Sequence, residues 1–347
     1  MNEPVPVAEG DCLSQAFVLN RKDLGQLIER LKRTYERVYL PVGDAFREAG
    51  SIEGISFTGA RALFGPKKYF FPPRESLFGF TKDGNIEDLL KEEKGAVIGA
   101  RVCDLKALEV LDKYFGELPE PFYLTRKEGT FVAGATCTEP HQSCFCVQFG
   151  GLSTEGLKYD LWFTDFGDVI LMETGSARGE EVVKDLDLLN APKELLYRKE
   201  RIIERVEREQ GFRRINDKKI FDWFSEEVTH EIWERLAEEC YACGKCNMIC
   251  PTCHCFDVVD MTDLEGSGER VRIWDACHLF RYGLVASGHN FRGERLARAQ
   301  YRIYDKFYYP YERYGIFACV GCGRCFEACS ADIDLRDVLK VAGGEGS

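Results

Sequence analysis

Two runs of four cysteines carry the most specific chemical signal in this sequence. The first run has the spacing C-x2-C-x2-C-x3-C, precedes a proline, and consists of Cys240, Cys243, Cys246 and Cys250. The second run repeats the spacing, precedes Ser330, and consists of Cys319, Cys322, Cys325 and Cys329. Cysteines at this spacing hold [4Fe–4S] clusters through their thiolates. The two runs therefore predict two such clusters.

Each cluster is predicted to take ligands from both runs, because the fourth cysteine of such a run ligates the other cluster of a pair. One cluster is assigned to Cys240, Cys243, Cys246 and Cys329. The other is assigned to Cys319, Cys322, Cys325 and Cys250. Gly244 and Gly323 let the loop backbones approach inorganic sulfide and donate N–H groups to it. A pair of zinc sites is the alternative, but zinc favours separated C-x2-C pairs over three cysteines in one tight loop.

A third group of cysteines lies in the N-terminal half. The loop ATCTEPHQSCFCVQFGG contains Cys137, Cys144 and Cys146, and Cys103 follows the apolar strand Ala96–Gly99. Because strand ends of an α/β sheet converge at one edge, Cys103 is expected to supply a fourth thiolate to this loop. We interpret the four as ligands of a third [4Fe–4S] cluster. Reduced, buried thiols are the alternative, since cysteine is among the most buried residue types.

The other cysteines and the histidines give weaker signals. Cys12 lies in a polar N-terminal stretch and is interpreted as incidental. Around the clusters, packing is favoured over a separate metal site for Cys253, Cys255 and Cys277. Hydrogen bonding is favoured over metal ligation for His141, His254, His278 and His289.

Composition restricts the environment and the partners. The chain has 347 residues, 45% of them hydrophobic, and a net charge of -12, so it can form two domains and does not suit nucleic acid. Sixteen cysteines without a secretory signal at the N-terminus favour metal thiolates in a reducing compartment. No apolar run approaches the roughly 18 to 20 residues of a membrane helix. We therefore expect a cytoplasmic protein with no membrane association.

Strand and helix patterns divide the chain into three predicted regions, and the fold class predicted is α+β. Residues 1–180 are expected to form an α/β domain, since short β-like runs alternate with helical patterns. Residues 181–239 are expected to be a charged helical linker region. Residues 240–347 are expected to form an all-helical dicluster ferredoxin domain, with helices over Asp275–Ser287 and Arg292–Phe307.

Several long segments resemble a known family. The segments CPTCHCFDVVD, WDACHLFRYGLVASGHNFRGERLARAQYRIYDKF and CVGCGRCFEACSADIDLRDVL resemble the beta subunit of soluble NAD(P)-linked [NiFe] hydrogenases, or sulfhydrogenases. The equivalent subunit of anaerobic sulfite reductase belongs to the same family. The resemblance continues upstream through IGARVCDLKALEVLD and ATCTEPHQSCFC and covers most of residues 35–340.

The resemblance implies an iron–sulfur relay subunit. Such a subunit passes electrons between a flavoprotein subunit that handles NAD(P)H and a catalytic subunit of [NiFe] or sirohaem type. It implies cluster ligation by the eight ferredoxin cysteines, and an additional cluster at the positions of Cys103, Cys137, Cys144 and Cys146. Two alternatives stay open, a flavin-dependent reductase with a built-in ferredoxin domain and a zinc-stabilised scaffold. No dinucleotide fingerprint, Walker A motif or catalytic triad pattern is visible, so no catalytic residue is predicted.

Overall fold

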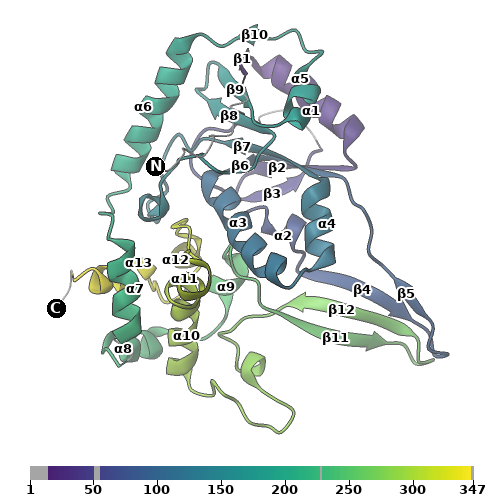
Figure 1. Cartoon of the computed structure of the whole chain (residues 1–347), viewed down its shortest axis with the longest axis vertical. Coiled ribbons are helices and arrows are strands. Elements are labelled where there is room, and N and C mark those ends of the chain that lie inside the picture. The colour runs from purple at the N-terminus through teal and green to yellow at the C-terminus, as the bar shows by residue number, and fades with distance from the viewer. Residues whose placement is uncertain (1–14, 51–54, 227–228, 345–347) are drawn as a thin grey trace, which may run out of the picture.

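An eight-stranded mixed sheet forms the N-terminal half of the molecule (Figure 1). The computed structural model describes residues 15–50, 55–226 and 229–344, so Cys12 lies outside the described residues. The strand order is β10-β1-β9-β8-β7-β6-β2-β3, and β2, β6, β7 and β8 are parallel neighbours. The strands are β1 (Ala16–Leu19), β2 (Arg37–Val42), β3 (Ala45–Glu48), β6 (Gly95–Ala100), β7 (Thr130–Ala135), β8 (Leu161–Asp165), β9 (Ile170–Thr174) and β10 (Leu189–Asn190).

Helices cover both faces of this sheet. On one face lie α1 (Arg21–Thr34) and α5 (Ala177–Val183), and the other face is covered by α2 (Lys67–Phe70), α3 (Val102–Glu117) and α4 (Pro121–Gly129). Helix α1 begins at a capping box between Asn20 and Asp23, and its leucines at helical spacing are buried against the sheet. The expectation of an α/β N-terminal half therefore agrees with the structure.

A second sheet contradicts the prediction of an all-helical C-terminal domain. Its four strands have the order β11-β12-β4-β5 and are β4 (Arg74–Phe80), β5 (Ile86–Asp88), β11 (Phe256–Thr262) and β12 (Gly268–Trp274). The hairpin β11–β12 lies between the two cysteine runs in the sequence and pairs with β4 of the N-terminal half. The resulting arm projects from the molecule (Figure 1). The hairpin itself is local, since β11 and β12 are joined by residues 263–267, but its other backbone partner, β4, lies almost 200 residues away in the chain.

The predicted helix over Asp275–Ser287 is also wrong. This stretch contains only the short 3-10 turn Phe280–Gly283, and α10 begins at Arg295 and ends at Phe307. Asn290 explains the alternative conformation, because its side-chain amide donates to the carbonyl of Phe280 and its side-chain oxygen accepts from the backbone N–H of Arg292. Local side-chain bonds of this kind compete with helix formation.

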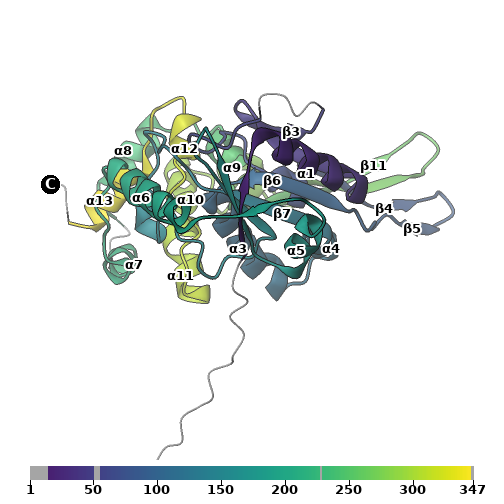
Figure 2. The same cartoon turned by 90° about the horizontal axis from the view of Figure 1, so that it is seen from above.

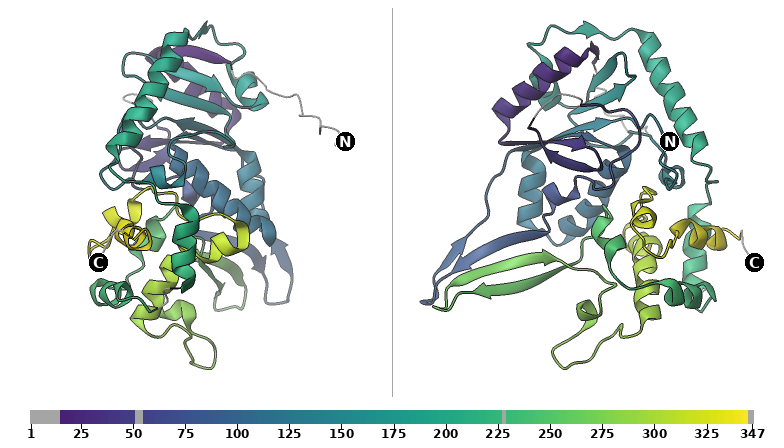
Figure 3. Two further views of the ribbon diagram at one scale, coloured as in Figure 1. Left: turned by 60° about the vertical axis from the view of Figure 1, so that its left-hand side comes forward. Right: turned by 180° about the vertical axis from the view of Figure 1, so that it is seen from behind.

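The remaining helices form a bundle at the other end of the molecule from the arm (Figure 2). They follow the long helix α6 (Lys193–Glu209), which runs alongside the large sheet toward the bundle (Figure 3). Their shared core includes Phe224, Trp233, Ile303 and Phe307. Among the described residues, no helix is long and apolar enough to cross a membrane. The other helices are α7 (Asp217–Glu226), α8 (Ile232–Glu239), α9 (Lys245–Ile249), α11 (Tyr309–Tyr314), α12 (Arg324–Glu327) and α13 (Leu335–Ala342).

Candidate iron–sulfur sites

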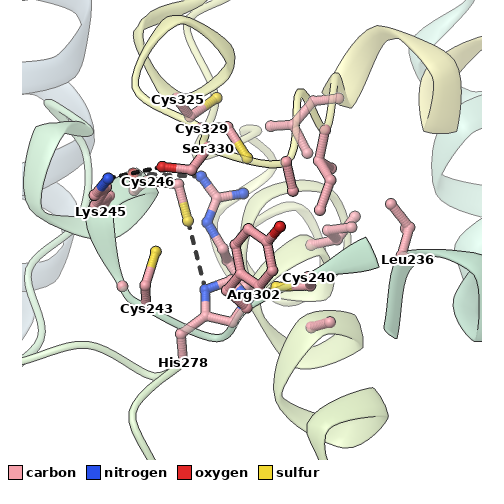
Figure 4. Close-up of a pocket in the computed structure, with 17 residues that line it drawn as sticks. Leu236, Cys240, Cys243, Lys245, Cys246, His278, Arg302, Cys325, Cys329 and Ser330 are labelled. Carbon is pink, nitrogen blue, oxygen red and sulfur yellow. Dashed lines mark hydrogen bonds between the residues drawn. The ribbon is translucent and has the colours of Figure 1, made fainter. Parts of the chain in front are cut away.

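The first cysteine group, formed by Cys240, Cys243, Cys246 and Cys329, lines one pocket between α8, α9, α10 and the segment after α12 (Figure 4). Cys325 also borders the pocket. Within the described ranges, no three His, Cys, Asp or Glu side chains converge as they would on a single metal ion. Both runs contribute thiols to this pocket, and their ligation of one cluster stays a prediction.

His278 lies against this pocket. Its Nδ1 is 3.5 Å from the sulfur of Cys246, and its Nε2 is 3.8 Å from the sulfur of Cys240. Burial, followed by the charges of Arg302 and Arg298, lowers the pKa of His278 to about 3. The imidazole is therefore neutral at physiological pH and carries one N–H; on Nδ1 this group faces the side-chain oxygen of Asn247 at 2.9 Å as well as the sulfur of Cys246. The prediction that His278 forms hydrogen bonds agrees with these contacts.

The second cysteine group consists of Cys319, Cys322, Cys325 and Cys250. Cys322 is buried and the other three are half-buried. Burial raises the pKa of Cys319, and the neighbouring thiols of Cys325, Cys322 and Cys250 raise it further. Burial likewise raises the pKa of Cys325 to about 12. Thr252 links Cys250 to the second run: its hydroxyl lies 3.2 Å from the Cys250 sulfur and donates to the carbonyl of Ala318 at 2.7 Å. A bound metal would replace the protons of the four thiols.

The third cysteine group, Cys103, Cys137, Cys144 and Cys146, is buried at the carboxyl ends of β6 and β7. Burial raises the pKa of all four thiols, and that of Cys146 to about 12. Negative charge on neighbouring thiols adds to these pKa increases: Cys137 acts on Cys103, Cys144 acts on Cys137, and both Cys137 and Cys144 act on Cys146. Cys103 and Cys137 follow the carboxyl ends of β6 and β7, which are parallel neighbours, and the gathering of all four thiols on one cluster stays a prediction.

The third group lies directly against the second. The backbone N–H of Phe145 donates to the carbonyl of Gly321 at 2.8 Å, and the Cys144 sulfur lies 3.8 Å from the carbonyl oxygen of Cys322. Arg61 also donates from Nε to that carbonyl oxygen at 2.8 Å. Side chains of Cys103 and Cys322 share one small buried cluster. The two groups are thus separated only by their own loops.

Two buried arginines lie between neighbouring cysteine groups. Arg324 forms an ion pair with Asp104 at 2.8 Å; burial acts to lower its pKa, but Asp104, followed by the thiols of Cys103 and Cys322, raises it. Arg302 lies on α10. Burial acts to lower its pKa, and the thiols of Cys246 and Cys325 raise it. In the described part of the chain, Arg302 has no ion pair, and Nη2 of Arg324 and Nε of Arg302 have no hydrogen-bond partner.

These orphaned donors test whether the site fits a cluster. Buried polar groups in folded proteins almost always have a partner, and a buried cation needs compensating negative charge. Thiolates and sulfides of an iron–sulfur cluster supply both acceptors and negative charge. The residues present therefore fit the group that the two cysteine runs imply.

The three remaining cysteines lie beside the second group. Cys253 forms a thiol hydrogen bond with Cys250, and Cys255 forms one with Cys277. Asn247 donates from Nδ2 to the sulfur of Cys277 at 3.1 Å. These pairs are consistent with packing around cluster ligands, and their role stays a prediction.

Sequence reasoning missed the cations that separate the groups. Arg324 stands between Gly323 and Cys325 within the second run, so its position inside a ligand loop was a usable signal. Arg61 and Arg302 had no comparable signal, because they lie far from the cysteines in sequence and approach them only through the fold.

Fold and site together define an iron–sulfur protein of the electron-transfer class. The 4Fe-4S dicluster domain family matches residues 239–333. The chain is also 34% identical over 321 residues to sulfhydrogenase 2 subunit beta of Pyrococcus furiosus, with 90% of this chain and 94% of that protein covered. No solved structure matches the chain. The chain belongs to the family of sulfhydrogenase beta subunits.

Proposed function

We propose that this chain is the electron-relay subunit of a hydrogenase-type complex and that it carries three [4Fe–4S] clusters, one on each cysteine group. The observation that carries the proposal is the serial arrangement of the groups. The third group adjoins the second through the contact between Phe145 and Gly321, and the second adjoins the first through Arg302 and Cys325. A chain of neighbouring redox sites suits transport of electrons through a protein.

Each cluster, when bound, accepts and donates one electron at a time. The protein's own residues supply the surroundings that make such a site stable. Arg324 and Arg302 compensate thiolate charge, and His278 and Asn247 lie within hydrogen-bond distance of thiol sulfurs. Burial of the third group excludes water. These are the means by which a protein adjusts cluster potential.

The partners we propose are a flavin- and NAD(P)-binding subunit and a catalytic [NiFe] subunit, in a cytoplasmic complex. Membership of the sulfhydrogenase beta family favours this over a sirohaem partner. The three predicted regions, with boundaries near residues 180 and 239, stay predictions. So does the role of the chain as a relay without substrate chemistry of its own.

Iron content tests the number of clusters. Anaerobic reconstitution of the full chain should give about twelve irons, since each cubane holds four. Cys144→Ala should remove about a third of the iron and leave the signals of the other two clusters unchanged. Cys12→Ala, which removes a cysteine outside the three groups, is the control. Saturation near eight irons in the wild type, with no change in the Cys144→Ala variant, would contradict the third cluster.

Crossed ligation makes a separate prediction. Cys250→Ser should perturb the electron paramagnetic resonance signal of the second group, and Cys329→Ser that of the first group. If each substitution instead perturbs the group of its own run, the assignment is wrong.

Reduction by different donors tests the relay role. The isolated, reconstituted chain should be reduced by dithionite and should not be reduced by NADH or NADPH. Rapid bleaching of its visible absorbance by either nicotinamide, with no other protein present, would show that the chain has its own flavin or nicotinamide site.

A further inference from the structure

We propose that an exposed, basic and apolar surface beside the first cysteine group docks an acidic redox subunit, and that electrons cross to that subunit there. The proposal rests on the proposed relay function and adds the place and the charge of the partner. We call this surface the docking patch. It is formed by Phe280, Arg281, Leu284, Val285, Phe291, Arg295 and Leu296.

Five large apolar side chains of the docking patch are exposed. Phe291 is 72% exposed and Phe280 is 53% exposed, and Leu284, Val285 and Leu296 are also exposed. All lie on the loop between β12 and α10 or on the first turn of α10, which extend from the lower edge of the bundle in Figure 1. Single exposed apolar residues are ordinary, but a group of large ones on a polar background marks an interaction surface.

The loop is held in shape by hydrogen bonds. Arg298 donates to the backbone carbonyls of His278 at 2.9 Å and Arg292 at 3.0 Å, and the Arg292 guanidinium stacks on Tyr301 at 4.2 Å. Asn290 adds the bond to the carbonyl of Phe280. The exposed side chains are therefore presented by an ordered loop, and a preorganised surface loses little entropy on binding.

Charge identifies the partner's chemistry. Residues 279–298 contain four arginines and one acidic residue, Glu294, in a chain whose net charge is -12. Arg281 and Arg295 are exposed; Arg281 lies 3.7 Å from Asp257 and 3.9 Å from Asp275, whereas Arg295 has no ion pair among the described residues. A local positive surface on an acidic protein attracts an acidic partner and orients it, while the remaining surface repels that partner. The occupant we infer is therefore the acidic face of a redox subunit.

The docking patch adjoins the first cysteine group. A Cβ atom on Gly244 would lie 3.5 Å from Leu279, and His278 contacts the sulfurs of Cys246 and Cys240. Cys243 is exposed, whereas the third group is buried throughout. The docking patch therefore lies beside the cysteine group that contains the most accessible of the proposed cluster ligands.

Electron transfer to an acidic protein tests the docking patch. Dithionite-reduced chain would be mixed with oxidised flavodoxin, an acidic one-electron acceptor, in a stopped-flow instrument at low and high salt. The cluster electron passes to the flavin, and the proton that the flavin semiquinone takes up comes from water. The test variant carries Arg281→Gln and Arg295→Glu, and the control carries the same charge changes on exposed arginines of α6, Arg201→Gln and Arg208→Glu.

The wild-type rate constant should fall as salt rises, because attraction between opposite charges is screened. At low salt the patch variant should be about tenfold slower, the lower end of electrostatic steering effects, and the control should stay within about twofold of wild type. Phe291→Ser should weaken binding at all salt concentrations, whereas Leu118→Ser, which removes a similarly exposed residue of the N-terminal half, should not. Equal rates for patch variant and control, or a wild-type rate that rises with salt, would overturn the proposal.

Two further readouts separate the outcomes. Reduction of the small dye methyl viologen should proceed at the same rate in all variants, and a slower rate in the patch variant would mean that the substitutions damage a cluster instead of docking. If the wild-type chain sediments as a dimer and the patch variant sediments as a monomer, the occupant is a second copy of the chain and the redox-subunit assignment is wrong. A chain that binds no iron defeats the relay function and this proposal together, whereas intact redox chemistry with unaltered patch variants defeats only this proposal.

Discussion

The two cysteine runs have identical spacing and opposite surroundings. In the first run, Tyr241 is 69% exposed and Cys243 is exposed. At the same positions of the second run, Val320 and Cys322 are buried against Cys103 and Ala107 of α3. Spacing therefore specifies how a loop holds a cluster, whereas tertiary contacts decide whether that loop faces a partner or another cluster.

The basic residue inside each run shows the same contrast. Lys245 is exposed and hydrogen-bonded to Ser330, and its counterpart Arg324 is completely buried and paired with Asp104. The residue directly before the basic residue is glycine in both runs. Three positions before the basic residue stands Ala242 in the first run and Gly321 in the second. Two matched pairs of substitutions and one substitution at His278 can break or sharpen this comparison.

The largest expected effect comes from the buried cation. Arg324→Gln leaves Asp104 as an uncompensated buried charge, which costs about 3–5 kcal/mol of the free energy of unfolding. Lys245→Gln at the equivalent exposed position should change that free energy by less than about 0.5 kcal/mol. Anaerobic urea unfolding of the reconstituted proteins measures both values. A double variant with Asp104→Asn should recover part of the loss, and equal costs at Arg324 and Lys245 would show that the two runs have similar surroundings.

A smaller effect is expected at the position that is glycine in one run and alanine in the other. Gly321 has φ +64°, and a Cβ there would lie 2.5 Å from the carbonyl oxygen of Phe145. Ala242 has φ +51°, so alanine is tolerated in this backbone conformation where the surroundings leave room. Gly321→Ala should therefore cost about 1–3 kcal/mol through overpacking.

The matched change Ala242→Gly removes the strain of a left-handed alanine from the folded state and increases the conformational entropy of the unfolded chain. The first effect stabilises the protein and the second destabilises it, so the free energy of unfolding should change by less than about 1 kcal/mol. Unfolding curves and the iron content of the third group give the readout, because Gly321 supports the loop of that group. If Gly321→Ala is as mild as Ala242→Gly, the junction between the second and third groups is looser than the structure indicates.

Local pattern explains what the sequence could predict. The two runs and the α/β alternation of the N-terminal half follow from spacing and strand order, and the parallel order of β6 and β7 brings the segments of Cys103 and Cys137 to one sheet edge. Cluster occupancy and ligation stay predictions. The helix expected over Asp275–Ser287 was wrong because Asn290 binds backbone groups of the loop, which no periodicity reveals.

The unpredicted features depend on residues far apart in the chain. β12 pairs with β4 on the side away from β11, and Arg324 forms its ion pair with Asp104, some 220 residues away in the chain. No local pattern encodes which of two identical runs will be covered by the N-terminal half. The asymmetry between the runs, which decides where a partner can dock, was for this reason invisible in the sequence.

The last expected effect concerns acid sensitivity of the first run, which His278 adjoins. Its pKa is lowered to about 3, whereas an unfolded histidine has a pKa near 6.5, so the unfolded state binds more protons between these values. Stability is therefore lost as pH falls from about 6.5 toward 3, by up to about 1.4 kcal/mol per pH unit. His278→Gln removes this dependence and keeps a neutral amide beside Cys246. The difference in unfolding free energy between wild type and this variant should shrink steadily from pH 6.5 to pH 4.5. His254, with a pKa of about 4, is unchanged in both proteins, so the comparison isolates His278. A difference that stays constant over this range would mean that His278 is solvated, and that the first run is open to water on the side that the structure closes.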